Sequence, residues 1–539
     1  MTAHPFSPLG RRTALEAMAA GPVDLLIIGG GITGCGLARE AALRGLSVAL
    51  VERDDFGCGT SGRSSKLVHG GLRYLAYGDF RMVREAVHER RVLRQIAPHL
   101  VHPLPFVMPI WKGQSLAKYR LGLWLFDRMA DADEAERHRL LTPGEIAGQL
   151  PGLRPGIKGG LTYGEYFTDD ARLTLENALS AAQHGALVAN HAPVIALTQE
   201  RGRVTGATVR DDLTGQTHDI QARVTVNATG PWAARTLDLS GHNAPKTLLP
   251  SKGIHLVFAA DRLPIAGAAT LMAPSGRAGF AIRRWDYVYL GTTDDAYEGP
   301  LDRAAADDRA VNDLLALARE CFPSLELTRA DVIGTWAGLR PLIAEPGKSP
   351  RDTSRHDEVW EGPAGLLTVA GGKLTTYRPM ARRVMAHVVA ALGKNPPNGP
   401  TAQPGSPLPG AAAPGPTRAE LGAAGIAGEA AERISWLYGA FATRLLAMGH
   451  ENPAWLAPVL PGYPLIRAQI RLAVEQEMAL SLTDLLDRRT SQMLFTPDHG
   501  LSVASAAADL MGQLLGWSEA EKARQLDQYR NVAKLHGSV

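Results

Sequence analysis

VDLLIIGGGITGCGLAREAALRGLSVALVE, residues 23–52, is the stretch that decides the fold. An apolar run long enough for one buried strand leads into Gly29, Gly31 and Gly34, spaced as G-x-G-x-x-G. A helix-like run of small and apolar residues follows, and a second apolar strand ends at Glu52. In such a unit the glycines allow a tight turn, the helix N-terminus faces a pyrophosphate, and the acid accepts hydrogen bonds from an adenosine ribose. An ordinary βαβ unit would leave the acid unexplained, so we predict a Rossmann-like dinucleotide-binding domain.

The segment just after this unit is unusually polar. Residues 60–75, TSGRSSKLVHGGLRYL, combine hydroxyl groups with a lysine, a histidine, glycines and an arginine. No single helix or strand accommodates that pattern throughout, because glycines and hydroxyl side chains favour turns and caps. Its position in the chain predicts contact with the reactive end of the cofactor.

Two later strands also end in glycines. Residues 223–227 (RVTVN) precede ATGPW, and residues 366–370 (LLTVA) precede GGKLTTY. In a doubly wound sheet, ligands bind beyond the carboxyl ends of the strands. A nicotinamide enzyme could use one such end, whereas three ends that converge on one extended cofactor favour FAD held permanently in the fold.

The composition is that of a soluble globular protein with more than one domain. The chain has 539 residues, of which 45% are hydrophobic and 21% charged, and this length is too great for one core. A formal charge of +3 gives no reason to expect a nucleic-acid partner. Cys35, Cys58 and Cys321 lack metal-ligand spacing, so no metal is expected, and so sparse a set suits a reducing cytoplasm. Residues 13–22 carry Glu16 and predict a small helix rather than an export signal.

A second, strand-like sequence pattern occurs between the nucleotide-binding segments. Several segments alternate polar and apolar residues or are rich in β-branched and aromatic residues, which predicts a mostly antiparallel sheet inserted between the parts of the nucleotide-binding domain. We expect this sheet to cover the substrate side of the flavin ring. Its segments are residues 161–167, 206–211, 253–257, 281–284 and 287–291. We therefore expect an α/β oxidoreductase region over residues 1–394, with FAD-binding segments at about 22–110, 170–240 and 330–394 and substrate-domain segments between them.

The C-terminal part is predicted to be a separate helical domain. Residues 395–416, NPPNGPTAQPGSPLPGAAAPGP, have the proline, glycine and alanine content of an extended, poorly ordered linker. Beyond it, residues 417–539 lack the alternation of strands. Helical patterns cover residues 418–423, 430–448, 466–486 and 518–535.

One amphipathic segment has two interpretations. Residues 119–129, YRLGLWLFDRM, place Trp124 and Phe126 among leucines, with basic residues at both ends. Such a helix could lie on a membrane surface, with its aromatic rings at the interface. A helix that packs on the core is the alternative. No run approaches the roughly 18 apolar residues that a membrane-spanning helix needs.

Seven motifs together resemble the FAD-dependent glycerol-3-phosphate dehydrogenases. They are DLLIIGGGITGCGLA (24–38), TSGRSSKLVHGGLRYL (60–75), NATGPW (227–232), SKGIHLV (251–257), LGTTD (290–294), WAGLRPL (336–342) and AGGKLTTYR (370–378), and EQEMALSLTDLLDRRT (475–490) extends the resemblance into the C-terminal part. The resemblance implies oxidation of sn-glycerol 3-phosphate to dihydroxyacetone phosphate, with electrons passing from FAD to a membrane quinone. It also implies a homodimer attached peripherally to the inner face of the cell membrane. Gly62 and Arg63 depart from the more usual small or hydroxyl-bearing pair.

The chemistry of this reaction indicates a catalytic set. Arginine binds two phosphate oxygens at once, and Arg340 and Arg73 follow glycines and match the family's substrate arginines. Lys373 could stabilise negative charge on flavin or substrate, and His255 is the best candidate for the general base. Tyr74 and Thr375 are expected to add hydrogen bonds to the substrate. Without the resemblance, a solvated surface charge for Arg73 and a buried core histidine for His255 would be the simpler interpretations.

The remaining predictions concern the cofactor. His69 is interpreted as a packing residue beside the cofactor rather than a site of covalent flavin attachment. The predicted cofactor-binding residues are Gly29, Gly31, Ile32, Thr33, Gly34, Glu52, Arg53, Thr60, Ser61, Ser64, Ser65, Lys66, Leu67, His69, Gly70, Gly71, Gly230, Gly372, Lys373, Leu374 and Thr375.

Three functions compete at this point. The first is the quinone-linked dehydrogenase. The second keeps the same fold and is an oxidase that uses oxygen, or a dehydrogenase for another polyol phosphate such as erythritol phosphate. The third is a flavin-binding protein without turnover, against which the presence of His255, Arg340 and Lys373 argues.

Overall fold

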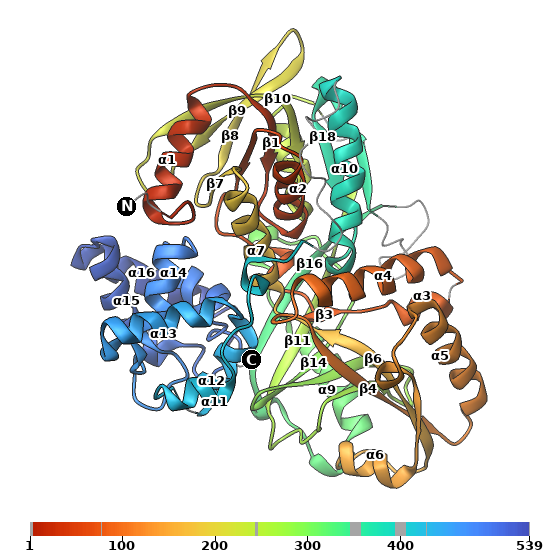
Figure 1. Ribbon diagram of the computed structural model, residues 1–539. Coiled ribbons are helices and arrows are strands. Elements are labelled where there is room, and N and C mark those ends of the chain that lie inside the picture. Colours follow the sequence, from red (N-terminus) through yellow and green to blue (C-terminus); the bar gives the residue numbers. More distant parts are fainter. Residues whose placement is uncertain are drawn as a thin grey trace.

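The computed structural model describes residues 4–76, 78–242, 246–344, 357–393, 406–426 and 428–537. Within these ranges the chain forms two large sheets with helices around them, and a group of helices follows at the C-terminal end (Figure 1). The predicted class, an α/β nucleotide-binding fold with a mostly antiparallel second sheet and a helical C-terminal part, is confirmed.

The first sheet is built around the glycine fingerprint. β1 (Val23–Ile28) lies between β2 (Val48–Val51) and β10 (Thr217–Asn227) and runs parallel to both. β18 (Leu367–Ala370) runs parallel to β10 on its other side, so the three strands with glycine-bearing ends lie side by side, as predicted. The sheet also contains β7 (Leu187–Ala189), β8 (Val194–Glu200), β9 (Arg203–Arg210) and β17 (Glu358–Glu361).

Helices cover both faces of the first sheet. α2 (Ile32–Leu43) packs between α7 (Asp170–Gln183) and α10 (Tyr377–Leu392) on one face (Figure 1). The small helix predicted before the first strand is α1 (Pro8–Ala19), which buries its apolar side on the opposite face. α8 (Ala233–Asp238) follows β10.

The second sheet forms around β11 (Leu248–Ala259), which pairs antiparallel with β14 (Tyr287–Gly291) and β16 (Val332–Ile343). The register sets His255 opposite both Gly291 and Trp336. The other strands are β3 (Leu67–Val68), β4 (His102–Trp111), β5 (Arg139–Leu141), β6 (Ile157–Phe167), β12 (Ala268–Met272), β13 (Ala278–Arg284) and β15 (Asp295–Ala296).

The two sheets do not follow the boundaries of the predicted segments. β3, β4 and β16 lie in the second sheet, although they fall within the predicted FAD-binding segments. Conversely, residues 206–211 were assigned to the inserted sheet, but β9 forms a hairpin with β10 and so belongs to the first. Strand patterns give the two faces of a strand but not its partner, since partners are set by contacts distant in sequence.

Helices flank the second sheet on the side away from the C-terminal helices (Figure 1). The segment predicted as an amphipathic helix is part of α5, where Leu123 and Phe126 are buried while Leu121 and Trp124 are 66% and 48% exposed. Apolar side chains therefore occupy both the packed and the outward sides of α5. The helices that flank the second sheet on this side are α3 (Leu72–Ala76), α4 (Phe80–Ile96), α5 (Leu116–Ala130) and α6 (Pro143–Gln149). A further helix, α9 (Asp308–Cys321), packs against β11 and β12.

The C-terminal part is helical, as predicted. Its helices are α11 (Arg418–Ala423), α12 (Gly428–Leu437), α13 (Phe441–Glu451), α14 (Arg467–Gln476), α15 (Leu501–Leu515) and α16 (Glu519–Ala533), with a π-helical turn at Asp484–Arg489.

The second half of the predicted linker is packed rather than extended. Leu408 is fully buried, and its backbone N–H donates to the Ile96 carbonyl. The Gly410 N–H donates to the Glu176 carboxylate over 2.9 Å. These contacts correct the expectation of an extended, poorly ordered linker for residues 406–416, because apolar burial and backbone hydrogen bonds offset the cost of ordering the chain. Residues 395–405 of that prediction lie outside the described residues.

Buried ion pairs join the C-terminal helices to the nucleotide-binding part. Asp55 is fully buried and accepts hydrogen bonds from the guanidinium groups of Arg488, at 2.6 Å, and Arg489, at 2.7 and 2.9 Å. Arg172 pairs with Glu477 over 2.7 Å, with both side chains buried. In a buried cluster of this kind each charge depends on its partners, since removing one leaves the others desolvated and less well compensated.

We expect Asp55→Ala to destabilise the protein by about 3–5 kcal/mol, because two buried guanidinium groups lose their shared carboxylate. The measurement is the thermal unfolding midpoint of the full chain. Asp527→Ala is the matched control, since it removes a carboxylate whose pair with Arg530 is mostly exposed, and exposed pairs contribute about 0–1 kcal/mol. Equal midpoints for the two variants would contradict the role given to Asp55.

Candidate active site

One large cavity lies where the two sheets meet. Its volume is about 1210 Å³, above the usual range of about 300–1,000 Å³ for small-molecule pockets. The glycine-bearing ends of β1, β10 and β18 line it from the first sheet, and parts of β11 and β16 line it from the second. The convergence predicted from three strand ends is thus present in one cavity.

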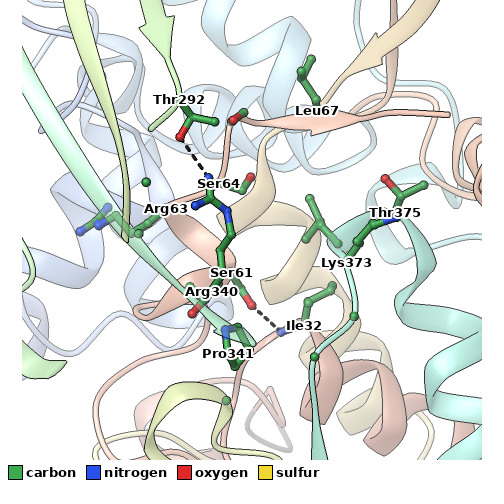
Figure 2. Close-up of a pocket in the computed structure, with 18 of the residues that line it drawn as sticks. Ile32, Ser61, Arg63, Ser64, Leu67, Thr292, Arg340, Pro341, Lys373 and Thr375 are labelled. Carbon is green, nitrogen blue, oxygen red and sulfur yellow. Dashed lines mark hydrogen bonds between the residues drawn. The ribbon is translucent and has the colours of Figure 1, made fainter. Parts of the chain in front are cut away.

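The fingerprint glycines give the cavity a tight backbone turn. Gly29 has a φ of +112°, and a Cβ atom there would lie 2.7 Å from the Ala228 carbonyl oxygen. At Gly34 a Cβ atom would lie 1.9 Å from the Gly29 carbonyl oxygen, so helix and turn pack without space for a side chain. The first turn of α2 faces the cavity, and the Ile32 N–H there donates to Ser61 Oγ over 2.9 Å (Figure 2). A helix N-terminus behind a glycine turn is suited to a pyrophosphate.

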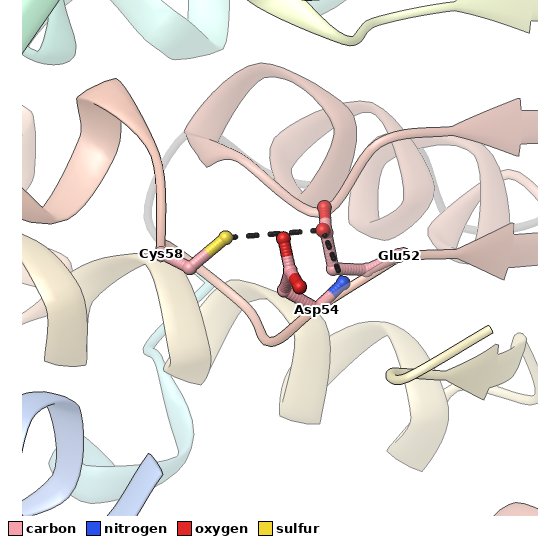
Figure 3. Close-up of side chains that lie close together, drawn as sticks. All are labelled: Glu52, Asp54 and Cys58. Carbon is pink, nitrogen blue, oxygen red and sulfur yellow. Dashed lines mark hydrogen bonds between the residues drawn. The ribbon is translucent and has the colours of Figure 1, made fainter. Parts of the chain in front are cut away.

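The acid that ends β2 lies beside this turn. Glu52 accepts hydrogen bonds from the backbone N–H groups of Gly30, at 2.6 Å, and Asp54, at 2.9 Å. Burial raises the pKa of Glu52, against the opposing effect of these two amides. The potential ligand atoms of Glu52, Asp54 and Cys58 all lie within 4.8 Å of one another, and Figure 3 shows the three side chains close together. Since the Glu52 carboxylate already binds the fingerprint backbone, we assign it to the nucleotide site and assign no metal here.

The polar segment of residues 60–75 contributes β3 to the second sheet and bonds to several other elements around the cavity. Thr60 Oγ1 donates to the Leu339 carbonyl of β16 over 2.5 Å. Ser64 Oγ donates to the Asp170 carboxylate over 2.7 Å. Further along, the His69 N–H donates to Thr375 Oγ1 over 3.2 Å. The segment therefore contacts the elements that would surround both the cofactor and the substrate.

The same segment is also bonded to the C-terminal helices. Both terminal nitrogens of Arg63 donate to the Asp487 carboxylate, over 2.8 and 2.6 Å. Figure 2 shows the Arg63 guanidinium group directed away from Arg340. The unusual residue of the segment is thus an anchor to the helical domain.

The side chain of Lys66 is directed into the protein interior. Its side chain is 2% exposed, and Nζ lies 2.5 Å from Asp170 Oδ1. Lys66 is absent from the lining of the cavity. A buried ammonium group needs a carboxylate partner, and Asp170 holds this one in the protein interior. The predicted contact of Lys66 with the cofactor is therefore left to its backbone.

Arg340 is held at the cavity wall by several acceptors. Its guanidinium group donates to Asp294 Oδ1 over 3.2 Å, and to Thr292 Oγ1 and the Thr293 carbonyl over 3.1 Å each. Figure 2 shows the contact between Arg340 and Thr292. The lack of a side chain at Gly253 makes room, since a Cβ atom there would lie 2.4 Å from Arg340 Nη2. The planar guanidinium group of Arg340 is thus oriented before any anion binds.

His255 lines the same cavity from β11. Its ring stacks on Trp336, with centroids 4.4 Å apart and planes 12° apart, and Nε2 lies 2.8 Å from Ser65 Oγ. Burial, with the positive charges of Arg340 and Lys66, lowers the pKa of His255 well below its ordinary value. The ring is therefore neutral at physiological pH, which is the form that accepts a proton.

Lys373 follows the third glycine-bearing strand end and lies close to Tyr74. Its ammonium nitrogen is 3.6 Å from the centre of the Tyr74 ring, a cation–π contact at the cavity wall. Thr375 also lines the cavity. Arg73 lies in α3 between Leu72 and Tyr74, and its side chain lies outside the described residues.

The cavity brings together most of the predicted site residues. His255, Arg340, Lys373, Tyr74 and Thr375 line it. So do the predicted cofactor-binding residues Gly29, Gly31, Ile32, Thr33, Glu52, Arg53, Thr60, Ser61, Ser64, Ser65, Leu67, His69, Gly71, Gly230, Gly372 and Leu374. Gly34 and Gly70 do not line the cavity; Gly34 allows the Gly29 carbonyl, and Gly70 the Phe126 ring, to pack closely against the backbone.

Sequence reasoning missed several lining residues. Thr292, Thr293 and Asp294 surround Arg340, and the motif LGTTD was a usable signal for them, although no role was assigned. Glu165, which accepts hydrogen bonds from the Gly70 N–H and from Arg90, had no local signal. Alternation in β6 indicates only that this side chain faces one side of a sheet.

These features define a flavin-dependent oxidoreductase: a dinucleotide-binding turn, a cavity that extends between two sheets, and cationic and basic side chains on the cavity wall. Residues 24–378 match the family model described as FAD dependent oxidoreductase. Residues 403–522 match the model described as the C-terminal domain of alpha-glycerophosphate oxidase.

Relatives that cover nearly the whole chain narrow the assignment. Aerobic glycerol-3-phosphate dehydrogenase of Bacillus subtilis (strain 168) is 36% identical over 559 residues, 100% of this chain and 99% of that protein. The enzyme of the same name from Staphylococcus aureus (strain USA300) is 37% identical over 538 residues, 96% of this chain and 95% of that protein. The crystal structure of glycerol-3-phosphate dehydrogenase from Bacillus halodurans complexed with FAD superposes with a TM-score of 0.81, at 32% identity and 98% coverage of both chains. The chain belongs to the family of FAD-dependent glycerol-3-phosphate dehydrogenases, and its cofactor is FAD.

Proposed function

We propose that this protein oxidises sn-glycerol 3-phosphate to dihydroxyacetone phosphate and passes the electrons to a membrane quinone. The observation that carries the proposal is the grouping of Arg340, His255 and Lys373 on the wall of the cavity that also contains the fingerprint turn. Oxidation of a phosphorylated secondary alcohol requires a guanidinium group that binds the phosphate and a neutral imidazole that accepts the hydroxyl proton. The names of the full-length relatives support the same substrate.

In this proposal each side chain has one task. Arg340 binds the phosphate through two of its N–H groups, in the place where it now contacts Asp294 and Thr292. His255 takes up the hydroxyl proton, and Lys373 stabilises the negative charge that develops on the substrate oxygen. FAD, when bound, accepts hydride from the carbon that carries the hydroxyl group. The glycine turn, Ser61 and the backbone around Glu52 would hold its nucleotide part.

The direct test is reduction of the bound flavin. Addition of glycerol 3-phosphate to the FAD-loaded protein without oxygen is expected to bleach the flavin absorbance. Erythritol phosphate and glycerol, added in parallel, test the length of the polyol and the need for phosphate. An unchanged oxidised spectrum with glycerol 3-phosphate would refute the proposed substrate.

Oxygen is the alternative acceptor. The family description matched by the C-terminal part names an oxidase, whereas the full-length relatives are named dehydrogenases. Peroxide release in air, compared with reduction of a soluble quinone analogue by the same sample, separates the two. The proposal expects turnover with the quinone analogue and little peroxide.

Access to a membrane quinone is proposed to involve α5. Lys118, Tyr119 and Leu123 of this helix line the cavity, while Leu121 and Trp124 are exposed on its outer side. Within the described residues no helix is long and apolar enough to cross a bilayer. A helix with exposed apolar residues and basic neighbours suits peripheral attachment. The homodimer and the peripheral location on the inner face of the cell membrane, which the resemblance implies, belong to the same proposal. Sedimentation with anionic vesicles tests it, with Leu121→Glu/Trp124→Glu as the variant expected to stay in solution.

Asp294 offers a test of the phosphate site. Its carboxylate lies 3.2 Å from Arg340, so a bound phosphate dianion would face a like charge. We expect Asp294→Asn to lower KM for glycerol 3-phosphate by about threefold to tenfold, because like charges a few ångströms apart repel by about 1 kcal/mol or more. The inhibition constant for inorganic phosphate should fall in parallel. A rise in both constants would instead mean that Asp294 acts by holding Arg340 in place.

A further inference from the structure

The His255 ring is fixed in one orientation. It stacks on Trp336, and the Tyr289 ring meets it edge-on with centroids 6.0 Å apart. On another side lies Gly291, where a Cβ atom would come within 2.2 Å of His255 Cδ2. The ring cannot turn to present a different atom to the cavity unless these neighbours move.

This orientation leaves one nitrogen for chemistry. Nδ1 is buried and has no hydrogen-bond partner among the residues that the structure describes. Nε2 lies 2.8 Å from Ser65 Oγ. In the tautomer that carries the ring proton on Nδ1, Nε2 has a single lone pair in the ring plane, and the Ser65 hydroxyl group occupies it. A substrate hydroxyl group has no second acceptor on this ring.

Ser65 itself is anchored. The Tyr289 hydroxyl group donates to the Ser65 carbonyl over 2.9 Å, and Trp336 Nε1 donates to the Ser64 carbonyl over 3.2 Å. The two aromatic residues that hold the imidazole therefore also hold the backbone beside it. Ser65 is partly exposed and lines the cavity, whereas His255 is 3% exposed. Both residues line the cavity, and Ser65 is the more exposed of the two.

We propose that Ser65 relays the proton from the substrate hydroxyl group to His255. The inference rests on the proposed function. The substrate O–H bond breaks as its proton moves to Ser65 Oγ, and the Ser65 proton moves at the same time to His255 Nε2. The substrate carbon loses hydride to FAD, so the alcohol is oxidised to the ketone while FAD is reduced. The proton on His255 returns to solvent by the reverse relay once the product has left.

The charges around the imidazole suit this relay. Burial and the charges of Arg340 and Lys66 keep His255 neutral before the substrate arrives. Asp170 compensates Lys66 over 2.5 Å, and Arg340 is the charge that a substrate phosphate would neutralise. Binding of the dianion would thus raise the proton affinity of His255 at the step that needs it.

The test compares Ser65→Ala with Ser65→Thr, which retains a hydroxyl group, in anaerobic stopped-flow reduction of the FAD-loaded protein by glycerol 3-phosphate. We expect Ser65→Ala to slow flavin reduction by about a hundredfold, within the range for loss of a proton-transfer group, and Ser65→Thr to restore most of the rate. Flavin absorbance per protein reports whether each variant has retained its cofactor.

A second measurement needs no variant. With the natural chain, the reduction rate in mixtures of H₂O and D₂O should follow a curved dependence on deuterium fraction, as two protons in flight require. A linear dependence, or Ser65→Ala reduced as fast as the natural chain, would overturn the relay and favour direct transfer to His255. If the natural chain itself is not reduced by glycerol 3-phosphate, the proposed function fails first, and that outcome differs from a failure of Ser65 alone.

Discussion

Replacing Arg340 with alanine is expected to raise KM for glycerol 3-phosphate at least about thirtyfold. A hydrogen-bonded charge partner contributes about 2–5 kcal/mol when its removal leaves the other charge unpaired, and each 1.4 kcal/mol is about a factor of ten. Arg340 already presents two donor nitrogens at the cavity wall. Steady-state kinetics of the FAD-loaded variant with a quinone analogue measure the effect.

Two comparisons make this prediction specific to phosphate. Glycerol lacks the phosphate, so its low kcat/KM should change little between the natural chain and Arg340→Ala. Arg340→Lys keeps the positive charge but loses the planar guanidinium group that binds two oxygens at once. Its KM for glycerol 3-phosphate should therefore lie between those of the natural chain and Arg340→Ala. If kcat/KM of Arg340→Ala falls by the same factor for glycerol and for glycerol 3-phosphate, Arg340 does not bind the phosphate.

Replacing His255 with glutamine is expected to slow flavin reduction by about a hundredfold to ten-thousandfold, the usual contribution of a general base. Glutamine retains a polar side chain of moderate size beside Trp336 and Ser65, but it cannot accept a proton. Binding of glycerol 3-phosphate should survive, because Arg340 is untouched. Anaerobic stopped-flow measurement over a range of substrate concentrations separates the reduction rate from the apparent dissociation constant.

The pH dependence provides a control for the same assignment. A base works only when it is neutral, so kcat/KM should fall as pH drops through the pKa of His255, which burial and the nearby Arg340 and Lys66 charges hold well below its ordinary value. In Arg340→Ala one of those charges is gone, the pKa rises, and the acidic limb should move to higher pH. An acidic limb that persists unchanged in His255→Gln would assign the base to another group.

Local patterns were enough to predict the nucleotide site. The strand, the turn and the helix of the fingerprint lie within residues 23–52, and the steric need for glycine at Gly34 is set by Gly29 and Ile27 of that same unit. Such features could be predicted because each depends mainly on short-range geometry.

Contacts between distant residues could not be predicted in this way. The Ser65–His255 pair joins residues 190 positions apart, and the Lys66–Asp170 pair joins residues 104 positions apart. A lysine in a polar segment resembles a ligand-binding residue until its partner is known. The assignment of residues 206–211 to the wrong sheet has the same cause, because a strand pattern does not name its neighbour.

The ion pair between Arg63 and Asp487 has a consequence for how the protein is made. The two residues are 424 positions apart, so during synthesis the polar segment of residues 60–75 gains this anchor only after most of the chain has left the ribosome. Domains generally fold as units from the N-terminal end, and the nucleotide turn is complete much earlier. A nascent chain would therefore form the nucleotide turn well before residues 60–75 gain this anchor, and the wall of the cavity is fully secured only after the C-terminal helices have been made.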